Sequence, residues 1–158
     1  MATQHRERVV YWDDGTEMER YGVDEKGVRQ GSYQSWYVTG APWVVCTYED
    51  DRLTGVYIDY HPNGVLRTRC GYRDGEIHGV SSSFDEQEIL LQRITYKRGR
   101  LSGSYVEFHP NGKPWIQGYY ADDKLEGPYT ETGEDGVIML SCEYRHGQPR
   151  WIHGGPRT

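Results

Sequence analysis

Two identical His-Pro-Asn-Gly tetrapeptides, at residues 61–64 and 109–112, carry the side chains best suited to metal binding. They lie 48 residues apart, which is twice the 24-residue period of an internal repeat described below. If each repeat contributes two neighbouring strands, His61 and His109 lie four strands apart, or ~19 Å at ~4.8 Å per strand. Zinc ligands lie ~2.1 Å from the metal. The tetrapeptides therefore predict turns, and we expect no metal site.

The three cysteines are the next candidates for chemistry. Cys46 and Cys70 are equivalent residues of adjacent repeats, so we expect ~10 Å between them, which exceeds the ~7 Å limit for a disulfide. Cys142 lies farther along the chain. An odd number of cysteines is typical of a reducing compartment. We expect all three to be buried as small apolar groups.

Acidic residues cluster at two turns that fall on the same expected edge of the sheet. None of the acidic clusters has the spacing of a calcium loop, so solvated turns are predicted. Carboxylates on one edge could still attract a basic partner and accelerate association. The acidic candidates for partner binding are Glu49, Asp50, Asp51, Asp122 and Asp123.

Enzyme motifs are missing from the sequence. There is no Gly-x-Ser-x-Gly, P-loop or His-Glu-x-x-His pattern, and a thin sheet lacks the deep pocket of an enzyme. Carboxylate pairs for glycoside chemistry remain possible on the sequence alone. We predict a protein that is not an enzyme, with no catalytic residues and no cofactor.

Composition narrows the classes of partner. The chain has 158 residues, 35% of them hydrophobic, with 14 Tyr, 20 Gly and a net charge of −6. That charge argues against nucleic acid and anionic membranes and favours a basic protein. The first ten residues, MATQHRERVV, contain no apolar signal segment, and no stretch approaches the ~20 apolar residues of a membrane span. We therefore expect a cytoplasmic protein.

The internal repeat has a period of 24 residues. Gly columns fall in phase with it at two places in the unit, with single exceptions at Glu88 and Trp151. A Tyr column is in phase without exception: Tyr48, Tyr72, Tyr96, Tyr120 and Tyr144. Agreement between independent columns is poorly explained by chance.

Each unit has the pattern of two strands and two turns, with Pro and Gly supplying the turn conformations. In unit 56–79 the tetrapeptide marks the first turn, and Asp74-Gly75 and Gly79 mark the second. Short turns make consecutive strands antiparallel neighbours. We predict an all-β fold: an antiparallel β-meander of about a dozen strands, in one elongated curved sheet. The single repeat domain, 1–158, divides into a degenerate cap unit 1–31, repeats 32–55, 56–79, 80–103, 104–127 and 128–151, and a tail 152–158.

Numbering each unit from 1 to 24, with Ser32 as position 1, predicts which side chains share a face. The odd positions 11 to 17 of the second strand carry the apolar load, including Leu66, Cys46 and Cys70, and alternate with the even positions. Turn geometry can shift the parity of the first strand. On the simplest pairing, the Tyr column at position 2 joins even positions 12 and 14 on the opposite face.

That opposite face combines Tyr, Trp and Arg, which are enriched at binding hot spots. The Tyr column, including Tyr57 and Tyr105, is better explained as part of the repeat, although we retain both as candidates. Residues that vary between units are the stronger candidates for binding. They are Trp43, Arg67, Arg69, Arg93 and Trp115.

The units resemble the bacterial variant of the MORN repeat. The pattern is a Gly, aromatics, His-x-Asn-Gly, a strand ending in Tyr, and Asp-Gly-x-x-x-Gly, matched best by 55–79 and 103–127. The resemblance covers 32–147. The third unit departs from it, because residues 81–88 have lost the turn motif, and the last unit has Thr132 in place of an aromatic.

The resemblance implies a binding function without catalytic residues. Similar proteins are often antitoxins or immunity proteins that neutralise a toxin by direct binding, and others are scaffolds or bind phosphoinositide membranes. We expect an immunity protein or antitoxin that occludes the active site of a cognate toxin in the cytoplasm. A scaffold or membrane-associated module is the alternative, and an enzyme ranks last. Exposed edge strands could also pair between chains, so the oligomeric state stays open.

Overall fold

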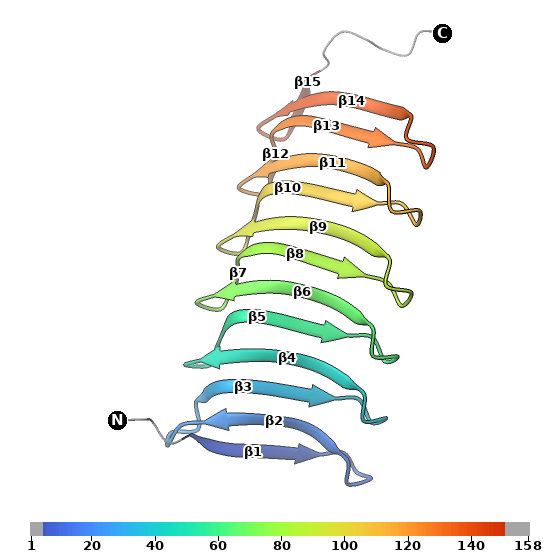
Figure 1. The fold of residues 1–158 in the computed structure, drawn as a ribbon. Helices are drawn as coiled ribbons and strands as arrows, with labels where there is room; N and C mark the ends of the chain where they lie inside the picture. Colours follow the sequence, from blue (N-terminus) through green and yellow to red (C-terminus); the bar gives the residue numbers. More distant parts are fainter. Residues whose placement is uncertain (1–4, 151–158) are drawn as a thin grey trace.

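Residues 5–150, which the computed structural model describes, form one open antiparallel sheet in which strands follow one another in chain order. Figure 1 shows an elongated stack of arched strands, with β1 and β15 at opposite ends. The predicted β-meander is confirmed. Two short strands, β7 and β12, pair with β6 and β11 off the main path. The strands are β1 (Arg6–Tyr11), β2 (Glu17–Val23), β3 (Arg29–Trp36), β4 (Pro42–Glu49), β5 (Arg52–Tyr60), β6 (Leu66–Arg73), β7 (Glu76–Ile77), β8 (Gly79–Phe84), β9 (Leu90–Lys97), β10 (Arg100–Phe108), β11 (Pro114–Ala121), β12 (Lys124–Leu125), β13 (Gly127–Thr132), β14 (Ile138–Arg145) and β15 (Gln148–Arg150).

No helix of the described residues is long and apolar enough to cross a membrane. The last predicted repeat ends at Trp151, which lies outside the described residues, as does the tail 152–158.

Five two-residue turns form one edge of the sheet, which we call the short-turn edge. Both central residues of each turn have positive φ, as at Asp74 and Gly75 with 53° and 83°. This is the signature of the type I′ turn, whose twist matches that of the flanking strands. Two of the turns use aspartates where Gly is normally preferred. The five central pairs are 50–51, 74–75, 98–99, 122–123 and 146–147.

Each of these turns is bonded to the unit before it. The N–H of Gly75 donates to the Leu53 carbonyl at 2.9 Å, and equivalent bonds recur along the edge. Where Asp replaces Gly, the carboxylate adds a second bond: Asp123 Oδ1 accepts the Leu101 N–H at 2.8 Å. That extra bond offsets the cost of a left-handed conformation in a residue with a Cβ.

The opposite edge, the long-turn edge, contains the His-Pro-Asn-Gly turns. His61 Nε2 bonds to the Phe84 carbonyl at 2.9 Å, and Asn63 donates to the Glu86 carbonyl at 3.0 Å. His109 and Asn111 make the equivalent two contacts in unit four, two units farther along the chain. The two side chains therefore attach each turn to the next unit, which explains why the tetrapeptide recurs.

The third unit keeps the turn although it lacks the tetrapeptide. Glu88 takes the position of the Gly with φ of 65°, and Asp85 Oδ1 accepts the N–H groups of Gln87 and Ile89 at 2.9 Å each. Because its carboxylate accepts hydrogen bonds, Asp85 cannot donate to the Phe108 carbonyl as His61 donates to that of Phe84. The joint between units three and four is therefore less tightly bonded at this edge.

The Gly residue at position 24 lies in a strand and not, as predicted from the sequence, in a turn. Gly79 was predicted to mark a turn, but it lies at the start of β8 with φ of 85°. The regular pairing of strands is interrupted there. The N–H of His78, just before Gly79, bonds to the Gly71 carbonyl outside that regular pairing. A residue with positive φ inside a strand produces a bulge, which Gly tolerates best.

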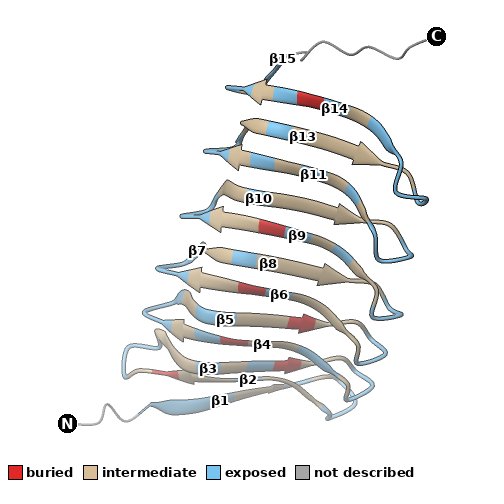
Figure 2. Cartoon of the chain, turned by 45° about the horizontal axis from the view of Figure 1, so that its top comes forward, coloured by how far each residue is buried: buried red, intermediate tan, exposed pale blue. Residues whose placement is uncertain are grey.

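One face of the sheet, the core face, carries the buried apolar side chains of the strands, among them Cys46, Cys70, Ile94 and Cys142. Figure 2 shows these buried sites as isolated patches in the middle of single strands. Registers such as Tyr33 opposite Cys46 place the position 2 tyrosines on this same face. Each buried small side chain is therefore covered by rings of its own face, since the described residues contain no second layer.

Tyr pairs form this cover. In each of four units the position 2 ring packs against the position 17 ring, with centroids 5.4 to 5.8 Å apart. In the third unit Ser81 replaces the position 2 Tyr, so Tyr96 lacks that partner. Burial raises the pKa of the Cys46 and Cys70 thiols to about 11. The predicted burial of all three cysteines is confirmed.

Restoring the tetrapeptide in the third unit should stabilise the protein. We predict that Asp85→His, Glu86→Pro, Gln87→Asn and Glu88→Gly together raise the free energy of unfolding by about 1–3 kcal/mol. The grafted His and Asn add two hydrogen bonds to the next unit, and the grafted Asn replaces one of the two that Asp85 accepts. The gain therefore comes from one net hydrogen bond and from the removed left-handed Glu. Urea denaturation measures it, with Asn63→Ala as the opposite control, expected to lose about 1 kcal/mol. An unchanged or lower urea midpoint in the graft would contradict this role for the turns.

Alkaline pH should destabilise the fold. Burial, followed by contact with a neighbouring carboxylate, raises the pKa of Tyr33, Tyr57, Tyr105 and Tyr129 well above the ordinary phenol range. Above a pH of about 10 the unfolded phenols lose their protons while the folded phenols keep them. The free energy of unfolding should then fall as pH rises, and Tyr129→Phe should flatten the slope. Equal slopes for Tyr129→Phe and the exposed control Tyr119→Phe in urea titrations would refute this.

Candidate functional site

A bulge in the second strand of every unit determines the site. In unit two Asp59 pairs with Thr68 and Tyr60 pairs with Leu66, so Arg67 is the extra residue. The same register shift occurs in the other four units. Two residues on the bulged strand then oppose one on its partner. Position 12 therefore joins position 13 on the core face.

Arg67 demonstrates this placement directly. Its Nε and Nη2 donate to the two carboxylate oxygens of Asp59 at 3.2 and 2.9 Å. Asp59 is only 7% exposed, whereas the Arg67 side chain is 42% exposed. Its hydrogen bonds to Asp59 raise the pKa of Arg67 above its ordinary value. This two-point contact compensates the buried charge of Asp59.

The other units carry large apolar side chains at position 12. Together with Arg67 they form a row across five units, which we call the position 12 row. Trp43 stacks on Tyr37 with ring centroids 5.4 Å apart, and Trp115 lies 5.8 Å from the His109 ring. The exposed fractions are 38% for Trp43, 44% for Leu91, 43% for Trp115 and 73% for Met139. Several exposed apolar side chains in a row that only Arg67 interrupts are typical of an interaction surface.

A row of carboxylates runs beside the position 12 row, at position 4 of the first strand. Tyr57 donates its hydroxyl to Asp59 at 3.3 Å, and Tyr129 donates to Glu131 at 2.7 Å. Tyr105 makes the same contact with Glu107. The two Glu differ from Asp59 in one respect: no ion pair joins either of them to a cation among residues 5–150.

The predicted division of faces was wrong, and the bulge is the reason. Tyr57 and Tyr105 lie on the core face, opposite Cys70 and Gly118, and the position 12 row joins them there. Leu66 was expected on the core face but pairs with Tyr60, one residue beyond Asp59, and so leaves that face.

Of the predicted Arg group, only two members remain together on the face away from the core, which we call the outer face. Arg69 and Arg93 are exposed and flank Ser82, which pairs with both. Arg67, on the core face, is separated from them.

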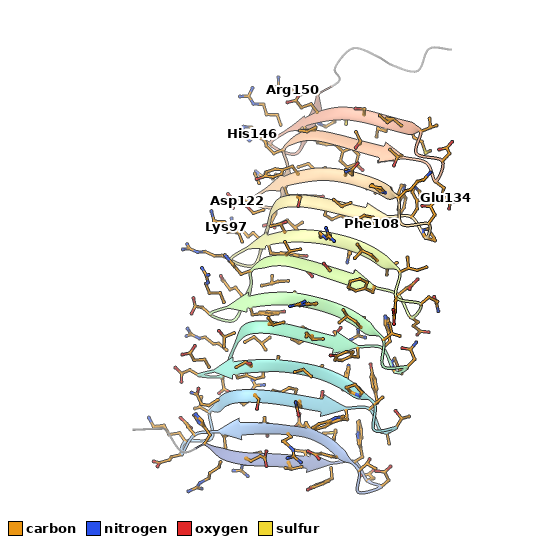
Figure 3. The ribbon with its side chains drawn as sticks, in the orientation of Figure 1. Lys97, Phe108, Asp122, Glu134, His146 and Arg150 are labelled. Carbon is orange, nitrogen blue, oxygen red and sulfur yellow. The ribbon has the colours of Figure 1, made fainter. Side chains whose placement is uncertain are left out.

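The acidic residues lie on one edge as predicted. Figure 3 shows Asp122 projecting from the short-turn edge beside Lys97, with His146 nearby. Three of the five predicted acidic candidates have partners inside the protein. Arg29 holds Asp51 at 2.8 Å, Gln30 donates to Asp50, and Asp123 bonds to its neighbouring unit.

The edge also carries many cations, with Lys97, Arg98 and Arg100 at the third turn. It is therefore an edge of mixed charge and a weaker candidate than the core face. Glu49 lies at the end of β4 beside these turns. The described residues contain no group of three or more His, Cys, Asp or Glu that could hold a metal ion.

Sequence reasoning missed half of this surface. Leu91 and Met139 were not chosen from the sequence, although they occupy the same position 12 as Trp43 and Trp115. Asp59, Glu107 and Glu131 were not chosen either. The three carboxylates recur at position 4, with spacings of 48 and 24 residues, and this recurrence was a usable signal. Burying a carboxylate inside a strand costs free energy unless the carboxylate is paired or hydrogen-bonded.

Comparison with known proteins finds two segments of the chain that are similar to a MORN repeat. The family model described as "MORN repeat variant" matches residues 53–74 and 101–122. These segments contain the two intact tetrapeptides and are separated by the altered third unit. The solved structure described as "Crystal Structure of TarM" aligns with 65% of this chain and 18% of that chain, at 12% identity and a TM-score of 0.33. That likeness carries no argument. No curated protein matches the chain.

Removing Arg67 should destabilise the protein, because the buried carboxylate of Asp59 would lose the cation that compensates its charge. We predict that Arg67→Leu lowers the free energy of unfolding by about 1–2 kcal/mol, between the values for exposed and buried pairs. Arg69→Leu is the matched control on the outer face, expected to change stability by less than about 0.5 kcal/mol. Urea denaturation of both variants checks the prediction. Equal effects of the two substitutions would show that the Asp59 contact contributes nothing.

Proposed function

We propose that this protein is an immunity protein or antitoxin that binds a cognate toxin through the core face and occludes the toxin's active site. The observation that carries the proposal is the position 12 row. Trp43, Leu91, Trp115 and Met139 stay exposed on a face that has no second layer among the described residues. Exposed apolar side chains in this arrangement are better explained by a partner than by folding.

The dimensions of the row suit a protein partner. Adjacent units are two strands apart, so five units span ~40 Å at ~4.8 Å per strand. A standard protein interface buries ~800 Å² on each side, which a face of this length can supply. Trp43 and Trp115 belong to a residue type that is enriched among hot spots.

The scaffold suits tight binding because it is held rigidly. Tyr pairs cover the core face, and hydrogen bonds at both edges connect successive units. A prearranged surface loses little conformational entropy when it binds. The match to the MORN repeat variant supports a repeat-based protein-binding scaffold. Within that scaffold, position 12 varies from unit to unit and so provides specificity.

Net charge favours a basic toxin. The chain carries −6, which would attract a basic nuclease or other cationic enzyme and accelerate the encounter. We place this encounter in the cytoplasm, where three reduced cysteines are also stable. The alternative is a scaffold or membrane-associated module that has no toxin partner. Flotation with anionic vesicles separates the two, because net negative charge predicts no binding.

Co-expression with the product of the adjacent gene tests the proposal. That product should stop growth when expressed alone and be harmless when this protein is present. Trp115→Ala should weaken binding by about 30-fold or more, the effect of losing a hot spot of ~2 kcal/mol. Val56→Ala is the matched control, since Val56 is exposed on the outer face. A harmless gene product, or toxicity that persists with this protein present, would defeat the proposal.

A further inference from the structure

Unit two contains an internal arginine–carboxylate pair that the later units lack. Arg67 and Asp59 occupy positions 12 and 4 of that unit and form a two-point contact. In unit four the same positions hold Trp115 and Glu107, and in unit five they hold Met139 and Glu131. The carboxylate is therefore retained on the core face, while the cation that would satisfy it is replaced by an apolar side chain.

The backbone places these groups equivalently. Glu107 pairs with Ile116 and Phe108 with Pro114, so Trp115 is the bulged residue just as Arg67 is. Tyr105 donates to Glu107 as Tyr57 donates to Asp59. Trp115 therefore stands beside Glu107 where Arg67 stands beside Asp59. Lys113, at the turn before Trp115, donates its ammonium group to the Asp135 carbonyl at 3.1 Å.

We infer that the Glu107–Trp115 and Glu131–Met139 pairs, together the arginine-acceptor site, receive arginine side chains of a basic protein partner. A guanidinium from the partner takes the place that Arg67 fills internally in unit two. It donates to the free oxygen positions of Glu107 and stacks on the exposed Trp115 ring. This inference rests on the proposed function, because it specifies the chemistry of the partner at the same face.

Arginine fits this site better than lysine. The guanidinium is planar, so it pairs with a carboxylate through two hydrogen bonds and also stacks on an aromatic ring. An ammonium group can do only one of these at a time. Met139 offers an apolar surface to the stem of a second arginine. Ile116 lies between Glu107 and Glu131, pairing with both, so the two carboxylates are two strands, or ~10 Å, apart.

The spacing defines a probe. In the polyproline II conformation, which short unfolded peptides readily adopt, residues three apart lie on the same side of the chain and ~9 Å apart, so acetyl-Arg-Gly-Gly-Arg-amide can reach both carboxylates at once. We expect it to saturate the protein with a millimolar dissociation constant, measured by calorimetry and Trp fluorescence. The lysine counterpart, acetyl-Lys-Gly-Gly-Lys-amide, should bind at least about five-fold more weakly.

Two variants of opposite design test the assignment. Glu107→Gln with Glu131→Gln keeps the acceptors for both Tyr hydroxyls but removes the charges, and should weaken peptide binding at least ten-fold. Trp115→Arg recreates the Asp59–Arg67 arrangement inside the protein and occupies Glu107 but not Glu131, so it should weaken binding at least about five-fold while the melting temperature stays the same or rises. Glu143→Gln removes a carboxylate from the outer face and should leave binding unchanged.

The outcomes separate this inference from the proposed function. Absence of saturable binding, equal affinity for the two peptides, or undiminished binding to Trp115→Arg overturns the arginine-acceptor site. If the variant with both Glu107→Gln and Glu131→Gln does not fold, the Trp115→Arg result decides the question. The peptide assay uses no toxin, so the site can stand if toxin neutralisation fails. Conversely, if a toxin is neutralised and the peptides do not bind, only the arginine-acceptor site is lost.

Discussion

A single-layer sheet has no opposing layer against which to bury its side chains, and the rest of the structure depends on this constraint. The hydrophobic stabilisation must come from neighbours on the same face. Small residues such as Cys46 and Cys70 therefore lie beneath Tyr rings from adjoining strands, and the rings pack in pairs. The apolar content of 35% is low because only one thin shell of side chains needs to be covered.

The same constraint separates constant positions from variable ones. Position 17, position 2 in four of the five units, and most of the turn residues hold the sheet together, so they repeat. Position 12 lies on a bulge at the margin of that packing, which leaves it free to carry Trp43, Arg67, Leu91, Trp115 or Met139. The third unit departs from this pattern twice, with Ser81 in the Tyr column and Asp85 in place of the His that binds the next unit.

Much of the fold was predictable from the sequence, because turns and strand alternation are local properties. The Gly and Tyr columns, read as strands and turns, correctly predicted a meander. The burial of the cysteines and the turns at His61 and His109 were also predicted correctly. The faces were not predictable. A bulge adds one residue without any marker in the sequence, and it moved Arg67, Trp43 and Trp115 to the core face. The role of Gly79 was similarly ambiguous, because a Gly with positive φ is equally compatible with a turn and with a bulge. A binding role for Glu107 and Glu131 could be inferred only by comparison with the internal Asp59–Arg67 pair, which the structure shows.

The central claim is that a protein partner covers the position 12 row, and footprinting tests it most directly. Once the neutralised toxin is in hand, side-chain labelling by photogenerated carbenes can be compared for the free protein and the complex. Our account predicts strong protection of Trp43, Leu91, Trp115 and Met139, with no change at Val56 and Val80 on the outer face. Protection of Val56 and Val80, with the position 12 row still labelled, would contradict it.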